Sequence, residues 1–158
     1  MIVLKIIGAV TAIAVSYLLG DLAADRYRKR VALLSELKLF ADNAARSIGE
    51  YKTPLKELAL ADEIPILSEY RFVDLIAQCD APDGRMLEML NENEREAVVE
   101  FVGNFGKCFK DELIDMCRSF GKLMSEALEN AKKECDTKSK IYRTVPPLCV
   151  TSVIILLM

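Results

Sequence analysis

Two long apolar runs mark the ends of the chain, and most charged residues lie between them. The first run, Ile2–Gly20, contains Lys5 as its only charged residue. Its nineteen residues would form a helix of about 28 Å, close to the roughly 30 Å hydrocarbon core of a bilayer. This pattern predicts a membrane-spanning helix over residues 1–21.

The second run, Ile141–Met158, is almost unbroken in apolar character but contains Arg143 and the pair Pro146-Pro147. As a helix it would extend about 27 Å, which suffices for a span if Arg143 reaches back to the surface. We predict a second span over residues 141–158, kinked where the prolines remove backbone donors. A terminal helix buried within the protein is the alternative.

Basic residues flank both runs on the side of the middle segment. Those expected to contact lipid headgroups are Arg26, Arg28, Lys29, Arg30, Lys140 and Arg143. Since basic flanks favour the cytoplasmic side, the middle segment is expected in the cytoplasm and both termini outside. A cleaved secretory signal ending near Leu22-Ala23-Ala24 is the alternative for the first run. It fits less well because Leu22 is large and the basic cluster would have to cross the membrane.

Small residues recur every fourth position in the first run. Gly8, Ala12, Ser16 and Gly20 share one helix face, where a second helix can approach closely. They are predicted to form a membrane helix-packing face.

The middle segment, residues 22–140, has the apolar periodicity of helices. An apolar stripe follows a three-four spacing, and its members are Leu34, Leu37, Ala41, Ala44 and Ile48. The first span is therefore expected to continue as one helix to about Ile48. Gly49–Lys52 ends this helix, and Thr53-Pro54 has the residues of a new helix start. A short second helix to Asp62 should fold back on the first.

Three further helices are predicted after the Ile64-Pro65 break. They cover Ile66–Ala77, a segment from Asn91 or Asn93 to Phe105, and a long segment Phe109–Cys135; Ala81–Gly84 is a turn, and Arg85–Leu90 forms one or two helical turns. No alternating strand pattern occurs. The predicted fold is therefore all-α, an antiparallel helical bundle flanked by N- and C-terminal transmembrane helices.

Composition excludes several functional classes. The 158 residues carry a net charge of −3, which gives no reason to expect a nucleic-acid partner. The five cysteines have no CxxC spacing and fit a reducing compartment, and histidine is absent. Without histidine, the chain lacks the commonest general base and zinc ligand.

No motif points to catalysis. The carboxylates are predicted on solvent faces, and the chain has no phosphate loop, dinucleotide fingerprint or nucleophile elbow. Cys108 and Cys117 fit core or half-buried positions, and a thiol enzyme would require one of them to have a depressed pKa. We therefore expect no enzyme, with no catalytic, metal or cofactor site and no small-molecule substrate.

Several motifs resemble the stage III sporulation protein AB family of endospore-forming bacteria, over the whole chain. The segments that carry the resemblance are Leu4–Val10, Gly20, Thr53-Pro54-Leu55, Phe101, Phe105-Gly106 and Lys140–Arg143. The sequence departs from the family at Glu50-Tyr51, where a Tyr-Gly pair is usual, at Val102, and at Pro146-Pro147.

The resemblance implies a helical domain similar to the cytoplasmic domain of type II secretion inner-membrane platform proteins. It implies a non-enzymatic platform in the mother-cell membrane around the forespore, within the channel that connects the two cells. The implied partners are membrane lipid, a secretion-type ATPase, ring proteins and potentially a second copy of the chain. The expected partner interface comprises Tyr51, Thr53, Pro54, Phe105 and Gly106. The alternative is a membrane-anchored regulatory or signalling protein without a transport role.

Overall fold

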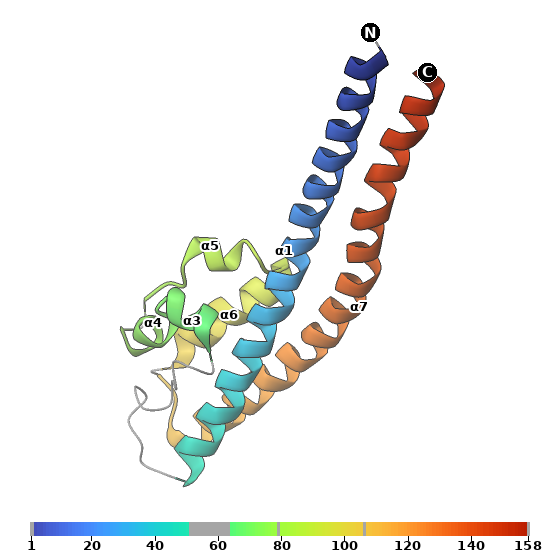
Figure 1. The fold of residues 1–158 in the computed structure, drawn as a ribbon. Helices are drawn as coiled ribbons and strands as arrows, with labels where there is room; N and C mark the ends of the chain where they lie inside the picture. The colour runs from blue at the N-terminus through green and yellow to red at the C-terminus, as the bar shows by residue number, and fades with distance from the viewer. Residues whose placement is uncertain (1, 51–63, 79, 106, 158) are drawn as a thin grey trace. The chain divides into compact units, whose positions relative to one another are not determined.

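A computed structural model of the chain describes residues 2–50, 64–78, 80–105 and 107–157 (Figure 1). Side chains are described for residues 11–49, 64–78, 80–105, 107–142 and 144–152. The described residues form helices and no strand, which confirms the all-α prediction. Within the described part of the chain, none of the helices combines the length and the apolar character needed to cross a bilayer.

Two helices account for most of the structure. Helix α1 covers Ile2–Glu50 and α7 covers Lys110–Leu157. The prediction that α1 continues without a break to about Ile48 is confirmed, since no proline or turn sequence interrupts it. Helix α7 continues through Pro146 and Pro147, so it joins the predicted last helix and the predicted second span into one element. The predicted short helix between Thr53 and Asp62 lies outside the described residues.

Between α1 and α7, the described residues form four shorter helices. They are α3 (Pro65–Glu69), α4 (Phe72–Gln78), α5 (Gly84–Leu87) and α6 (Glu92–Phe105). The single helix predicted over Ile66–Ala77 is wrong, because the chain breaks at Tyr70-Arg71. Arg71 has a φ of 52°, a left-handed conformation that a right-handed helix cannot contain.

The chain divides into two units. A terminal unit consists of Met1–Lys29 and Ala131–Met158, and a central unit consists of Arg30–Asn130. In the terminal unit, the first part of α1 and the last part of α7 run antiparallel, and the two chain ends lie at the same end of the pair (Figure 1). Each unit is described separately below.

The core of the central unit is a cluster of phenylalanine rings surrounded by aliphatic side chains. Phe40 of α1 makes an edge contact with Phe72 of α4 at a ring-centroid distance of 5.5 Å. Phe101 of α6 stacks on Phe120 of α7 at 4.1 Å. Such aromatic pairs add to the stability that burial of their surface provides. Four members of the predicted stripe on α1 are fully buried, whereas the fifth, Ile48, is half-buried; the buried members are Leu34, Leu37, Ala41 and Ala44.

Candidate functional site

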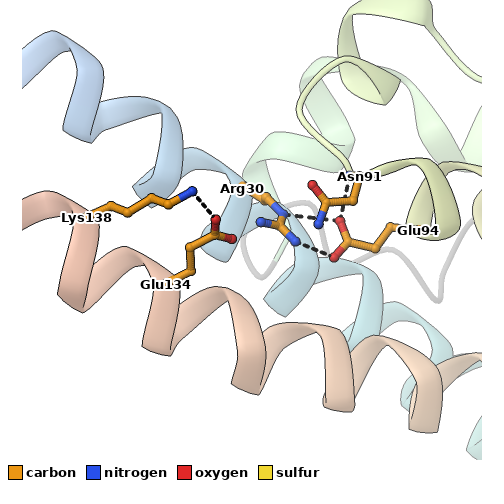
Figure 2. A network of polar contacts seen from close by, with 5 residues as sticks. All are labelled: Arg30, Asn91, Glu94, Glu134 and Lys138. Atoms are coloured by element: carbon orange, nitrogen blue, oxygen red, sulfur yellow. Dashed lines mark hydrogen bonds and ion pairs between the residues drawn. The ribbon is translucent and has the colours of Figure 1, made fainter.

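A buried ion pair joins α1 to the start of α6 in the central unit (Figure 2). Arg30 Nη2 lies 2.7 Å from Glu94 Oε1, and Arg30 Nε lies 3.2 Å from Glu94 Oε2. Glu94 Oε2 also accepts a hydrogen bond of 2.9 Å from the backbone N–H of Asn91. This carboxylate therefore caps the first turn of α6, where the sequence predicts a helix start at Asn91 or Asn93, and it also neutralises the guanidinium of Arg30.

A second buried carboxylate holds the start of α3. Glu36 Oε2 accepts a 2.8 Å hydrogen bond from the backbone N–H of Leu67. The residue before α3 is Ile64, whose side chain cannot cap a helix, and Pro65 occupies the first helical position. Glu36 of α1 thus supplies the missing cap from another helix.

These two buried carboxylates overturn the prediction that the acidic residues all lie on solvent faces. A signal was present in the sequence. Arg30 precedes Leu33, Leu34 and Leu37 by three, four and seven residues, so it lies on the same face of α1 as these buried leucines. Glu36 lies in the same segment of α1. Glu94 lies four residues before buried Val98. A charged residue in register with a buried stripe indicates an internal partner.

An apolar groove lies on the outer side of the α6–α7 pair. It encloses about 200 Å³, and its lining residues are Ala97, Glu100, Phe101, Asn104, Met116, Ser119, Phe120 and Leu123. Leu123 is 43% exposed although it is a large aliphatic residue. Five of its eight lining residues are apolar, so the groove is a candidate binding surface of the central unit.

In the terminal unit, aromatic and basic side chains meet between α1 and α7. The rings of Tyr27 and Tyr142 stack with centroids 6.0 Å apart, and Lys138 Nζ lies 5.0 Å from the Tyr27 ring centroid. Lys138 also donates a hydrogen bond to Glu134 (Figure 2). The hydrogen bond with Glu134, and then that with Tyr27, raises the pKa of Lys138.

The helix-packing face predicted in the first run lies partly against α7. Ser16 and Gly20 are buried, while Ala12 is exposed. Gly8 lies outside the residues whose burial is described. Ala24 continues the same face and is completely buried. Ala12 and Ser16 also line a wide apolar hollow of about 500 Å³ together with Pro146 and Val150 of α7.

The residues predicted to contact headgroups have different surroundings. Arg26, Arg28, Lys29 and Lys140 are exposed, and the side chain of Arg143 lies outside the described residues. Arg28 and Lys29 pair with Asp21 and Asp25 at 3.7 and 2.9 Å. Arg30 is the exception. Its side chain is only 10% exposed and is held by Glu94, so the prediction for Arg30 is corrected to an internal partner.

Most of the predicted partner interface cannot be placed. Tyr51, Thr53, Pro54 and Gly106 lie outside the described residues. Phe105 is buried and packs on Phe40 and Phe101, so it belongs to the core instead of presenting a docking surface. The aromatic residue exposed near this end of α6 is Phe109, at 82%, although its spacing predicted a core position.

The cysteines and acidic residues show no arrangement typical of catalysis. Burial raises the pKa of the Cys117 thiol to about 11, which suppresses the nucleophilic thiolate. Within the described ranges, no group of three or more cysteine or carboxylate side chains could hold a metal ion. Exposed Asp83 is paired with Arg85, whose side-chain hydrogen bond lowers the pKa of Asp83, and its carboxylate caps α5.

Comparisons of the chain with known protein families, curated proteins and solved structures find no match.

Proposed function

We propose that the chain is a non-enzymatic membrane platform protein, similar to the stage III sporulation protein AB family, in the channel between mother cell and forespore. The observation that carries the proposal is the concentration of exposed large apolar side chains in the terminal unit. They are Val15, Leu18, Leu19, Leu22, Ile141, Val145 and Leu148. Exposed apolar side chains in this number are unfavourable in water and are typical of a surface that contacts lipid or protein.

The order of residues along the terminal unit supports lipid as the environment. The exposed apolar residues of α1 are followed by exposed Arg26, Arg28 and Lys29. On α7, Lys140 precedes the exposed apolar residues, and Tyr142 lies between Ile141 and Val145. Tyrosine rings with basic neighbours are typical of the membrane interface, where the ring is partly dehydrated and the cation meets phosphate.

The proposed spans are residues 1–21 and 141–158. Residues 2–10 and 153–157, which are apolar apart from Lys5 and Gly8, lie outside the described side chains, so the proposal rests on the sequence for those segments. The antiparallel course of α1 and α7 in the terminal unit supports a topology with both chain ends on one side of the membrane. The central unit would then lie in the cytoplasm, where a secretion-type ATPase is available.

Cysteine accessibility in growing bacterial cells that express the chain tests this topology. The five native cysteines are first replaced by serine or alanine. In Phe109→Cys, a membrane-impermeant maleimide should label the protein only after the cells are permeabilised. In Met158→Cys, it should label intact cells. Labelling of Phe109→Cys in intact cells, or release of the protein from membranes by alkaline carbonate, would overturn the proposal.

The time of synthesis separates the platform from a general membrane regulator. A platform of the proposed channel should be made only in the sporulating mother cell, and it should co-purify with the secretion-type ATPase and ring proteins of that compartment. Synthesis throughout growth would favour the regulator.

A further inference from the structure

The groove between α6 and α7 has the spacing of a helix-binding surface. Ala97, Glu100, Phe101 and Asn104 follow the i, i+3, i+4, i+7 pattern on α6. Met116, Ser119, Phe120 and Leu123 repeat that pattern on α7. The stacked rings of Phe101 and Phe120 form the floor, while Leu123 stands partly exposed at one side. Two helices thus present a continuous apolar trough about two turns long.

An exposed aromatic residue lies at the start of α7, beyond the trough. Phe109 lies seven residues before Met116 and directly precedes α7. Its backbone carbonyl accepts a 2.8 Å hydrogen bond from the N–H of Leu113, and its own N–H donates to Glu112 Oε2, so Phe109 occupies the N-cap position of α7. With 82% of its surface exposed, this ring is an apolar side chain that a partner can contact at this end of α7.

Carboxylates dominate the rim. Helical spacing places the exposed residues Glu96 and Glu100 of α6, and Glu112, Asp115, Glu126 and Lys122 of α7, along the outer edges. Arg118 lies 3.8 Å from Asp115 and offsets part of that charge. Exposed Lys107, whose backbone N–H donates to the carbonyl of the lining residue Asn104, offsets a further charge. The five carboxylates still outnumber the three basic residues, so a bound partner should carry positive charge on the flanks of its apolar face.

We propose that this α6–α7 groove docks a basic amphipathic helix of a partner protein. Leucine-like anchors of that helix would fill the trough and contact Phe109, and lysine or arginine side chains would pair with the acidic rim. This is the helix-in-groove mode of recognition, in which apolar anchors supply affinity and flanking charges supply orientation.

Other occupants fit the groove less well. A volume of about 200 Å³ is below the range of about 300–1,000 Å³ that encloses small ligands. Anionic lipid headgroups and acidic peptides would be repelled by the rim. A second copy of the chain would bring a second acidic central unit to an acidic surface. The inference does not depend on the platform assignment, because the groove belongs to the central unit alone.

The test measures binding of a labelled probe helix to the full chain in a neutral detergent. The probe is a fluorescein-labelled peptide of about 14 residues with leucine at helical spacing and lysine elsewhere. Fluorescence anisotropy should report binding above the signal from empty micelles. The same peptide with glutamate in place of lysine should not bind, and salt of about 0.5 M should weaken binding of the basic peptide.

Two single substitutions to lysine distinguish binding in the groove from nonspecific electrostatic attraction. Leu123→Lys places a cation at the groove and should weaken binding about tenfold or more. Val99→Lys is the matched control, because Val99 is 45% exposed on α6 but does not line the groove. It should change the affinity less than about twofold. Far-UV circular dichroism should show that both variants retain the helical content of the parent chain.

A triple neutral variant tests the rim. This variant combines Glu100→Gln, Asp115→Asn and Glu126→Gln, and it should bind the peptide about tenfold more weakly. The matched control replaces three exposed carboxylates away from the groove, Glu69→Gln, Asp80→Asn and Glu88→Gln, and should not weaken binding. Equal losses in both sets would overturn the proposal, as would equal affinity of Leu123→Lys and Val99→Lys. If the groove variants instead change the oligomeric state of the chain without peptide, the occupant is a second copy and the proposal fails.

Discussion

Arg30 and Glu94 are 64 residues apart in sequence, yet their charged groups meet at 2.7 Å and are almost completely buried. The pair connects α1 to the first turn of α6. Because Glu94 also binds the backbone of Asn91, one carboxylate links the long helix to the cap of the shorter one.

Removing one member of this pair should be strongly destabilising. In Arg30→Met, Glu94 keeps its charge in a buried position without the guanidinium, so we expect a loss of about 3–5 kcal/mol in the free energy of unfolding. The double variant Arg30→Met/Glu94→Gln should lose much less, because the amide oxygen can still accept from Asn91. Urea titration of the full chain in neutral detergent, followed by circular dichroism, measures both. Equal losses would show that packing of Arg30 outweighs its charge.

Glu36 should control the local stability of α3. Replacing Glu36 by alanine leaves the buried Leu67 N–H without its acceptor, which should cost about 1–3 kcal/mol. Glu36→Gln retains an acceptor oxygen and should cost less. In the alanine variant, hydrogen exchange at the Leu67 amide should accelerate by a larger factor than the loss of global stability alone would produce. Unchanged protection of that amide would contradict the capping role.

The long helices were predictable because helix periodicity is local. The apolar stripe that begins at Leu34 and the absence of helix-breaking residues predicted the C-terminal end of α1 to within two residues. The break at Arg71 was not predictable in the same way, since arginine has no preference for a positive φ and tertiary packing must stabilise it. Pro146 and Pro147 removed backbone donors but did not end the helix, since α7 continues past them to Leu157.

The site was less predictable than the fold, because its contacts join distant segments. Asn91 and Glu94 could be recognised as a helix start, but nothing near them indicated Arg30. The register of Arg30 with the buried stripe indicates an internal partner but does not identify Glu94. Arg30 also ends a basic cluster that fits a membrane boundary, and this cluster predicted a headgroup contact. Phe109 followed the apolar repeat and was expected inside, yet it precedes α7 and lies at the surface. Periodicity identifies a face but not which neighbour covers it.

Gly121 tests how closely α1 and α7 approach in the central unit. A Cβ at this position would lie 3.1 Å from Asp42 Oδ1 and 3.5 Å from the Ala41 Cβ. Asp42 is exposed and its carboxylate can move, so Gly121→Ala should be neutral or more stable by up to about 1 kcal/mol through helix propensity. Gly121→Leu should be destabilising by about 1–3 kcal/mol, because its larger side chain would collide with buried Ala41 of α1. Unfolding in urea distinguishes these outcomes.

Cys117 should react far more slowly in the folded chain than in the unfolded chain. At pH 8, raising the pKa from 9.0 to about 11 reduces the thiolate fraction roughly a hundredfold. The folded chain should therefore show slow alkylation at Cys117, with a rate that rises about tenfold per pH unit until the pH approaches 11. Mass spectrometry of native and urea-unfolded samples measures the difference. Rapid alkylation at neutral pH in the folded chain would support a thiol chemistry that the present site does not favour.

The chain contains no tryptophan, so a single introduced indole can report the depth of the proposed spans. In lipid vesicles, Tyr142→Trp should be quenched most by bromine attached near the headgroups, because Tyr142 lies beside Lys138 and Tyr27 at the proposed interface. Leu148→Trp, about 9 Å further along α7, should be quenched by bromine deeper in the acyl chains and emit at shorter wavelength. Phe109→Trp is the control in the central unit and should be unaffected by brominated lipid. If Leu148→Trp behaves like Phe109→Trp, the exposed apolar surface of α7 contacts something other than lipid, and the membrane platform would have to be abandoned.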